Sequence, residues 1–480
     1  MKRNGYWALL WCFLLFQAEV RAAGEQRQNG LALVHATVID GTGAATRGDL
    51  TIIIRSNRIS EIAKSSTIAL PANVQVINAS GKFVIPGLWD MHIHWYDKDY
   101  LPLFIANGVT GARMMWGTPN HQEWRKEIEQ GSLPGPRMYL ASQLIDGPNP
   151  LWPDSLSVTN EADARQAVRK VKATGADFIK VYSVLPREAY FAIADEARKQ
   201  GLPFAGHVPI AVSVKEAAEA GQKSIEHLTG ILNGCSTHEG ELLKTTQQIL
   251  REVAAANRPM SVLSAKMREP NRLALETYNP IKAGLLFTEL KKHGTWQCPT
   301  LVVLRNISSL NDPAITSDPR IKYMPPQFKS MWDQANDSRF KSRTAEDFAL
   351  GKKLFQKDLE IVGAMQRAGV GILAGTDTGN PYCFPGFSLH DELALLVQAG
   401  LTPMEALQAA TRNPARFMGR EEDLGTVEKG KLADLVLLEA NPLDDIANTK
   451  RIDSVIFDGR LFSKSYLNEM LKKMESVKKD

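Results

Sequence analysis

Short apolar runs alternate with helical segments through most of the chain. Runs such as "DFIKVYS" (177–183) and "VGILAGTD" (370–377) are largely apolar without strict alternation, which is typical of parallel strands buried on both faces. Helical stretches such as "EADARQAVRKVKATG" lie between them and end in a basic residue followed by glycine. The runs occupy residues 82–94, 108–115, 137–145, 177–183, 202–208, 223–228, 297–304 and 370–377. Eight alternating strand and helix units predict an α/β fold with a (β/α)8 TIM barrel.

The two ends of the chain follow a different pattern. Residues 30–85 and 425–465 hold short β-type segments separated by glycine and polar turns, without a long helix between strands. We expect these ends to pair into one small β-sandwich domain beside a barrel that spans residues 86–420. Residues 235–365 are too long for ordinary barrel units, so we expect extra helices that cover the site. Residues 466–480 predict a solvated basic C-terminal tail.

The first 22 residues have the features of a Sec-type signal peptide. Lys2 and Arg3 precede an apolar stretch, and small residues follow before a cut near Ala22. The stretch is about half the ~20 residues that a membrane span needs, which argues against a stable membrane anchor. Cys12 follows a tryptophan rather than a small residue, which argues against a lipid anchor. We therefore expect an exported protein, periplasmic or secreted.

Composition and charge exclude some functions. The 480-residue chain is 44% hydrophobic and 23% charged, as in ordinary globular proteins. Its net charge of +4 falls to +2 without residues 1–22, which carry three basic residues and one acidic residue. A nearly neutral protein is not expected to bind nucleic acid. The remaining cysteines, Cys235, Cys298 and Cys383, allow one disulfide at most and lack a metal-binding spacing.

Polar residues stand where several predicted strands end. In a (β/α)8 barrel these ends form the catalytic face. Alone, each residue has an ordinary explanation, such as a hydrogen-bonded core histidine, a lysine that extends to the rim or an aspartate that caps a helix. A set of six at five strand ends instead favours a metal site, because imidazole and charged groups in buried positions must be paired or metal-bound. The six residues are His92, His94, Lys180, His207, His227 and Asp377.

The motifs that carry these residues resemble the amidohydrolase superfamily of metal-dependent hydrolases, in its imidazolonepropionase-like and Xaa-Pro dipeptidase-like branch. They are "FVIPGLWDMHIH", "IKVYS", "FAGHVP", "SIEHL", "GTDTG" and the block from "GLTPMEALQAATRNP" to "KGKLADLVLL", and they extend over nearly the whole mature chain. The resemblance also implies a homo-oligomer, whose size the sequence leaves open.

The resemblance implies a binuclear metal centre. His92, His94 and Asp377 would hold one divalent ion, and His207 and His227 the second. Lys180 would bridge both as a carbamate formed with CO2, which requires a neutral amine of the kind that burial favours. The ligands suit Zn²⁺, while Mn²⁺, Co²⁺ and Fe²⁺ stay open.

Such a centre predicts hydrolysis of a C–N amide bond. A hydroxide shared by the two metals would attack the carbonyl carbon, and Asp377 would carry the proton to the departing amine. The expected substrate is a dipeptide or an N-acyl amino acid. Alternatives are cyclic amides, bulky N-acyl aromatic amino acids, or a non-catalytic envelope protein that binds a ligand or metal. The complete ligand set argues against the last of these.

Residues for substrate contact are less sharply defined. Tyr182 follows Lys180 by two positions, so that both side chains can face the site, and Arg113 stands near the end of the second strand. Either suits a substrate carboxylate, although a structural role is the favoured alternative for both. His390, in the loop and helix after the last strand, is a further candidate. Trp95, Tyr96 and Trp116 predict either an aromatic wall or ordinary packing.

Overall fold

The structure is a computed structural model that describes residues 30–255 and 260–476. The predicted signal peptide lies outside these residues, and export stays a prediction. None of the helices within the described ranges is long and apolar enough to cross a membrane.

A parallel sheet forms most of a closed barrel. Its strands are ordered β13-β12-β11-β10-β8-β7-β6, and every neighbouring pair is parallel. Their bounds are β6 Leu88–Ile93, β7 Val109–Met114, β8 Arg137–Asp146, β10 Phe178–Val181, β11 Phe204–Gly206, β12 Ser224–Glu226 and β13 Trp296–Cys298, with the short β9 Leu156–Ser157 beside β8. These strands are almost entirely buried, which explains their continuous apolar pattern.

The predicted eighth strand closes the barrel without forming a regular ladder. Ile372 bridges Gln297 on one side, and Thr378 bridges Ile93 on the other. The amide of Asp377 donates to the carbonyl of His92 at 2.7 Å, which fixes this segment against β6. The (β/α)8 prediction is therefore confirmed.

One predicted strand is only partly correct. Residues 297–304 were expected to be a strand, but β13 ends at Cys298 and helix α12 (Leu301–Ser308) follows. An apolar run such as "LVVL" does not by itself distinguish a buried strand from a buried helix.

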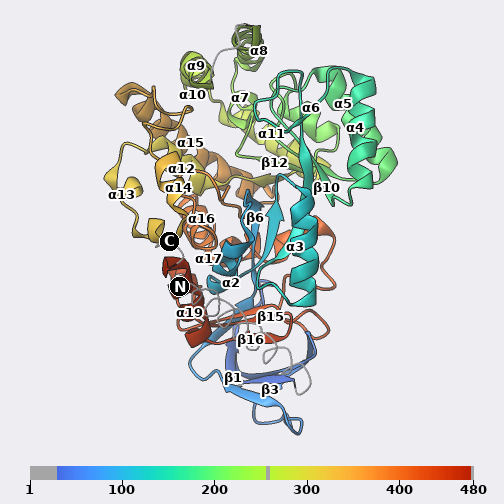
Figure 1. Ribbon diagram of the computed structural model, residues 1–480, viewed down its shortest axis with the longest axis vertical. Helices are drawn as coiled ribbons and strands as arrows, with labels where there is room; N and C mark the ends of the chain where they lie inside the picture. Colours follow the sequence, from blue (N-terminus) through green and yellow to red (C-terminus); the bar gives the residue numbers. More distant parts are fainter. Residues whose placement is uncertain (1–29, 256–259, 477–480) are drawn as a thin grey trace, which may run out of the picture.

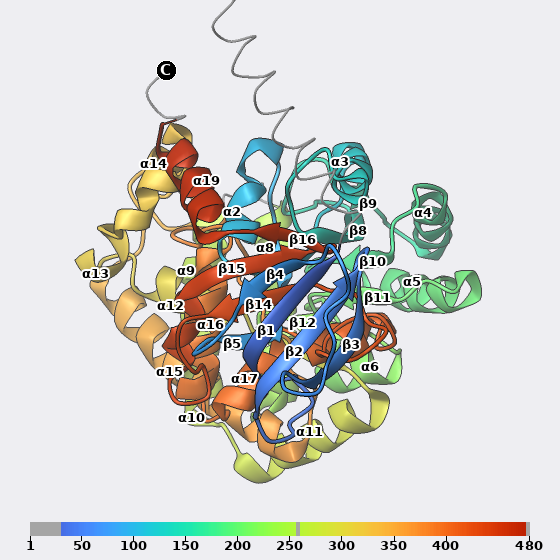
Figure 2. The same cartoon turned by 90° about the horizontal axis from the view of Figure 1, so that it is seen from below.

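Strands from both ends of the chain form a second, mixed sheet, seen below the barrel in Figure 1. Its order is β16-β15-β14-β5-β1-β2-β3, with β4 beside β1. The bounds are β1 Leu31–Val38, β2 Arg47–Arg55, β3 Arg58–Lys64, β4 Gln75–Asn78, β5 Phe83–Pro86, β14 Leu435–Leu438, β15 Ile452–Phe457 and β16 Arg460–Phe462. β5 and β14 pair antiparallel, so the N-terminal and C-terminal segments meet in the middle of the sheet (Figure 2).

This terminal sheet curls into a nearly closed unit rather than forming two separate layers. The edge strand β3 bonds to the segment just before β14: the amide of Ile59 donates to the carbonyl of Lys431 at 2.9 Å, and that of Gly430 donates back to Ile59 at 2.8 Å. The enclosed core is aliphatic, with Leu33, Ile52 and Leu435 among its fully buried members. The two ends therefore form one domain, as the pattern predicted.

Helices surround the barrel and extend beyond its catalytic end. Those that follow the first six strands are η2 Lys98–Tyr100, α2 Pro102–Ala106, α3 Pro119–Gln130, α4 Glu161–Ala173, α5 Arg187–Gln200, α6 Val214–Glu219 and α7 Ile231–Gly234. The helices expected within residues 235–365 are α8 Glu239–Ala255, α9 Met260–Lys266, α10 Arg268–Glu276, α11 Pro280–His293, α12, α13 Pro313–Thr316, η3 Pro319–Tyr323, α14 Pro326–Met331 and α15 Ala345–Ala368. The last are α16 Phe387–Gln398, α17 Pro403–Ala409, α18 Arg412–Met418, η4 Ile446–Lys450 and α19 Lys464–Ser476. In Figure 1, α8, α9 and α10 lie at the end of the molecule opposite the terminal sheet.

The C-terminal segment differs from the expectation of a solvated tail. Helix α19 buries Leu467, Met470 and Met474 against the main core and contacts α2 and η3. Their spacing of three and four residues gives one apolar helix face, which the abundance of lysines on the other face obscures in the sequence.

Candidate metal centre

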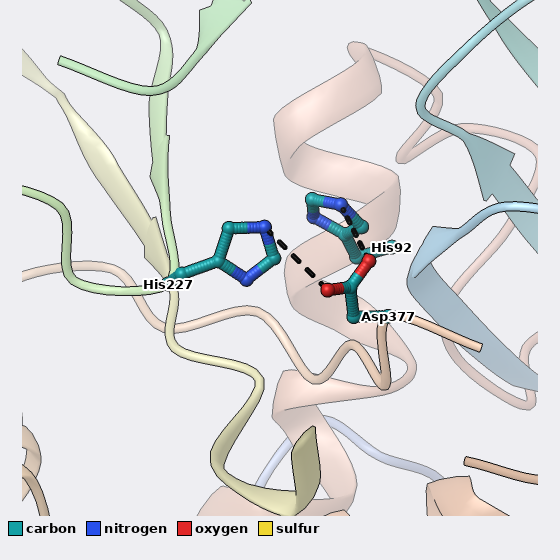
Figure 3. Close-up of side chains that lie close together, drawn as sticks. All are labelled: His92, His227 and Asp377. Atoms are coloured by element: carbon teal, nitrogen blue, oxygen red, sulfur yellow. Dashed lines mark ion pairs between the residues drawn. The ribbon is translucent and has the colours of Figure 1, made fainter. Parts of the chain in front are cut away.

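Three side chains from distant parts of the chain point toward one another at the catalytic end of the barrel (Figure 3). His92 is the penultimate residue of β6, His227 follows β12, and Asp377 stands on the closing segment. The Nε2 atom of His92 lies 3.4 Å from Oδ1 of Asp377, and Nε2 of His227 lies 3.9 Å from Oδ2. These atoms are close enough together to bind one ion.

The other three predicted ligands lie beside this group. Nε2 of His94 is 3.2 Å from Nε2 of His92 and 3.3 Å from Oδ1 of Asp377. The ring of His207 lies edge-on to that of His227, with centroids 5.1 Å apart. Lys180, on β10, is fully buried beside these histidines, whose pKa values are lowered first by burial and then by the charge of Lys180. The structure thus brings all six residues together.

Several polar atoms of this cluster are buried without a hydrogen-bond partner. Within the described residues, Lys180 Nζ, Asp377 Oδ1 and His94 Nδ1 make no hydrogen bond. Buried polar groups are nearly always hydrogen-bonded, so such a concentration needs an explanation. Imidazole nitrogens and a carboxylate are typical ligands of divalent transition metals. The donor set therefore fits bound metal ions.

Three histidines are oriented by a contact on the opposite side of the ring. Nδ1 of His92 lies 2.8 Å from Oε2 of Glu226, Nδ1 of His207 lies 2.8 Å from Oγ of Ser183, and Nδ1 of His227 lies 2.7 Å from Oγ1 of Thr300. Such contacts fix the ring and leave Nε2 as the ligand atom, as is usual for metal-bound histidine.

The backbone at this centre is strained. His227 and Asp377 have φ values of 56° and 57°, and Thr300 has a φ of 50°. Non-glycine residues seldom adopt this left-handed conformation, and it persists where the surrounding structure enforces it, often at functional sites. Here it aims two ligands and one hydroxyl at the same centre.

Burial sets the charge of the cluster. It lowers the pKa of His92, His207 and His227 well below the usual value, and the positive charge of Lys180 acts in the same direction. The histidines are therefore neutral and able to bind a metal. Burial also lowers the pKa of Lys180 and raises that of Asp377. Both changes favour the uncharged forms of the two side chains.

A buried ion pair lies directly beneath His92. Arg113 donates to Glu226 at 2.7 Å, to the hydroxyl of Ser224 at 2.9 Å and to the carbonyl of Met91 at 2.5 Å. Both charged side chains are fully buried. Of the two alternatives for Arg113, this placement supports the structural role over substrate contact, because its three nitrogens are occupied inside the barrel.

His390 also lies away from the metal centre. On helix α16, its Nδ1 contacts the hydroxyl of Thr449, and its Nε2 contacts the carbonyl of Asn107 at 3.0 Å. The ring is buried and joins α16 to the loop before β7 and to η4. The structure therefore assigns His390 to packing between elements rather than to substrate contact.

Tyr182 faces the site as expected. Its ring stacks on His207 with centroids 4.1 Å apart, and its hydroxyl accepts a hydrogen bond from the indole of Trp152 at 2.8 Å. Trp152 lies edge-on to Trp116, which contacts Tyr96 in the same way. These four side chains form a continuous aromatic wall from the metal centre to the surface, where Tyr96 is half exposed.

Two further expectations can be compared with the structure. Trp95 does not join the aromatic wall, because it is buried, donates to the carbonyl of Asp97 and stacks on Phe328. Cys235, Cys298 and Cys383 are each buried and free.

Sequence reasoning missed the residues that support the ligands: Glu226, Ser183 and Thr300. Glu226 directly precedes His227 in "SIEHL", and a carboxylate in an apolar strand was a signal that it has a buried partner. Ser183 and Thr300 gave no such signal, because an isolated hydroxyl near a strand end is common.

Comparison with known proteins agrees with this architecture. The model of the family described as "Amidohydrolase family" matches residues 83–462. A curated relative, the ochratoxinase of Aspergillus niger, is 36% identical over 122 residues, which are 24% of each chain. The chain thus matches about a quarter of the length of that relative.

Solved structures share the fold over nearly the full length. A bottromycin amidohydrolase has a TM-score of 0.74 at 24% identity, covering 95% of this chain and 93% of that one. A Xaa-Pro dipeptidase with methionine in its active site has a TM-score of 0.65 at 21% identity, covering 90% of this chain and all of that one. The family model extends from β5 through the whole barrel to β16, and on this ground the chain belongs to the amidohydrolase family.

Proposed function

We propose that this protein is a metal-dependent hydrolase that cleaves a C–N amide bond in a small substrate. The observation that carries the proposal is the convergence of six ligand side chains, four buried and two partly buried, three of which retain polar atoms without a hydrogen-bond partner in the described structure. A purely structural site would be expected to satisfy these atoms internally.

The chain's own residues define how the metals would be held. His92, His94 and Asp377 would bind one divalent ion, and His207 and His227 a second. Bound divalent metals polarise a carbonyl and lower the pKa of water, which supplies a nucleophile at neutral pH. Neutral imidazoles together with one carboxylate suit zinc, which we propose as the resident metal.

We further propose that Lys180 joins the two ions as a carbamate. The carbamate needs an uncharged amine, and burial favours this form of Lys180. Nζ has no hydrogen-bond partner among the described residues, so it is free to react with CO2. The modified side chain would offer two oxygen atoms, whereas an ammonium offers none.

Asp377 has the properties needed to move a proton. Its carboxylate lies among the other proposed ligands, and Oδ1 lacks a hydrogen-bond donor in the described structure. We propose that Oδ1 accepts a proton from the attacking water and delivers it to the departing nitrogen. An amine leaves an amide readily only when protonated, so this transfer is needed for cleavage.

The site favours a substrate with a small amide, such as a dipeptide or an N-acyl amino acid. The likeness to a Xaa-Pro dipeptidase structure supports this class. The wall of Tyr96, Trp116, Trp152 and Tyr182 favours a second candidate, an N-acylated aromatic amino acid, because stacked rings bind aromatic groups.

Hydrolysis of a panel of amides, with metal content measured, tests the function. The panel comprises dipeptides, N-acyl aliphatic and aromatic amino acids, and cyclic amides. We expect about two metal ions per chain and chelator-sensitive cleavage. A protein that binds the metals but cleaves none of these compounds would instead support a non-catalytic binding role.

His92→Ala and Asp377→Asn test the assigned roles. We expect His92→Ala to lose metal and activity, and Asp377→Asn to lose at least a hundredfold in kcat, with circular dichroism unchanged in both. Exposed Glu360→Gln is the matched control and should keep full activity. Normal turnover by folded Asp377→Asn would refute the proposed proton transfer.

We also propose that residues 1–22 direct export. N-terminal sequencing of the protein recovered from the periplasm or medium tests this, and a mature chain that begins near Ala23 is the expected result.

A further inference from the structure

A cavity of about 430 Å³ adjoins the metal centre, with His227 in its wall. Helix α15, which packs on α12, contributes Gly351, Leu354, Phe355 and Asp358, whose spacing places them on one face of the helix. The cavity therefore connects a proposed metal ligand with a carboxylate on a different element.

Most of the cavity wall is apolar. Val208, Ile210, Leu232 and Leu304 are among the aliphatic residues, and they come from the loop after β11, from α7 and from α12. A wall of this kind accommodates a hydrocarbon chain.

Besides the neutral His227, two residues of ionisable type line the cavity, Arg343 and Asp358. Arg343 is already engaged: it donates to the carbonyl of Ile307 at 2.5 Å, and its guanidinium lies 4.6 Å from the ring centroid of Phe340. Asp358, in contrast, has no hydrogen bond or ion pair to any residue that the structure describes, although it is mostly buried. The cavity thus contains one carboxylate, that of Asp358, that can pair with a cationic group of a ligand.

We propose that Asp358 is a specificity residue that selects substrates with an ammonium group at the end of an aliphatic chain, as in a lysine side chain. This inference rests on the proposed amide hydrolysis. The aliphatic wall would contact the methylene groups, and the carboxylate of Asp358 would pair with the ammonium, because a long amine buries its stem while its charge finds a partner.

The electrostatics of Asp358 agree with this assignment. Burial raises the pKa of its carboxyl group to about 8, which reflects the cost of a charge without a partner. A cation in contact favours the ionised form and removes this cost.

Matched substrates with and without the amine test the proposal. The probes are Nα-acetyl-lysine with Nα-acetyl-norleucine, and Lys-Ala with norleucyl-Ala, so that the amine lies on either side of the scissile bond. We expect kcat/KM of the metal-loaded wild type to favour lysine at least tenfold in one pair. Asp358→Asn should reduce this ratio about tenfold or more, and Glu360→Gln, two residues away on the exposed face of α15, should preserve it. Taking the ratio within each variant removes any effect of partial unfolding.

A binding measurement separates this proposal from the proposed function. If no probe is hydrolysed, titration calorimetry measures the affinity of the same probes for Asp377→Asn and for Asp377→Asn/Asp358→Asn. The comparison shows whether Asp358 recognises the amine. Tighter binding of the lysine compound that disappears in the double variant supports the role of Asp358 without turnover. Equal binding of lysine and norleucine compounds, or a kcat/KM ratio unchanged in Asp358→Asn, would overturn it.

Discussion

Arg113 and Glu226 show how a single buried pair supports the metal centre. Glu226 accepts from Arg113 and also contacts Nδ1 of His92, so it connects a structural cation with a proposed metal ligand. Both side chains are fully buried. A charge in such a place is tolerated only with its partner, because desolvation otherwise dominates.

Arg113→Met should therefore destabilise the protein strongly. The substitution leaves Glu226 charged and without its cation, and losses of about 3–5 kcal/mol are typical in this situation. Urea unfolding of the metal-free protein measures the effect. The double variant Arg113→Met/Glu226→Gln should recover part of the loss, because the uncompensated charge is gone. A loss below about 1 kcal/mol in the single variant would contradict this account.

Because of Asp358, the free energy of unfolding should fall as pH rises. Burial raises the pKa of its carboxyl group to about 8 from the usual value of 3.8. Between these values the folded form holds the proton that the unfolded form has released, so stability falls as pH increases. Asp358→Asn should thus unfold at higher urea than the wild type, by more at pH 8 than at pH 5. One titrating group can change the free energy of unfolding by at most about 1.4 kcal/mol per pH unit. A difference that does not change with pH would show that Asp358 has an ordinary pKa.

At the scale of elements, α12 is held at its N-terminus by Glu392 of α16. The carboxylate accepts from the amides of Leu301 at 3.0 Å and Val302 at 2.7 Å. The preceding residue, Thr300, places its hydroxyl 2.7 Å from Nδ1 of His227. A helix terminus thus positions a ligand of the metal centre.

Glu392→Ala should weaken binding of one of the two metals. Loss of the acceptor frees the start of α12 and with it Thr300, and loss of such supporting contacts typically costs 10–100-fold in affinity. Glu392→Gln retains an oxygen acceptor, so its metal affinity should lie between those of the wild type and Glu392→Ala. Competition with a chelator measures the two affinities separately. Unchanged affinity in Glu392→Ala would show that His227 is held without α12.

Helix α19 should contribute measurably to stability. Leu467 is 3% exposed and packs against the main core. Leu467→Ala is expected to cost about 2–5 kcal/mol, the range for buried leucine. Lys472→Ala, on the exposed face of the same helix, should change stability by less than about 0.5 kcal/mol. Similar unfolding curves for both variants would mean that α19 is a solvated tail that adds nothing to the stability of the core.

Local patterns predict much of this fold and part of the site. The strands that carry His92, Lys180 and His207 at or next to their ends could be recognised, because burial and strand ends leave a signal within a few residues. The roles of Arg113 and His390 could not, because they depend on partners that are distant in sequence, such as Glu226 and Asn107. Asp358 lies in a polar helix, and only the tertiary fold shows that it faces a cavity.

For the whole molecule, Arg137 joins the barrel to the terminal sheet. Near the start of β8, it donates to Asp434 at 2.7 Å and to Asp458 at 3.1 Å, both at the borders of strands of the terminal sheet. The guanidinium also lies over the ring of Phe457. These contacts lie at the end of the barrel opposite the metal centre, where a residue acts on stability rather than on catalysis.

The pairing of β5 with β14 has a consequence for how the protein is made. Roughly 350 residues separate the end of β5 from the start of β14. At about 5–20 residues per second, a ribosome needs on the order of 20–70 s to cover that distance. During this time the nascent N-terminal sheet presents an unpaired apolar edge, the kind of surface on which chains aggregate. The terminal domain can therefore be completed only after the entire barrel has been synthesised. Until then its first strands need protection from aggregation at this unpaired edge.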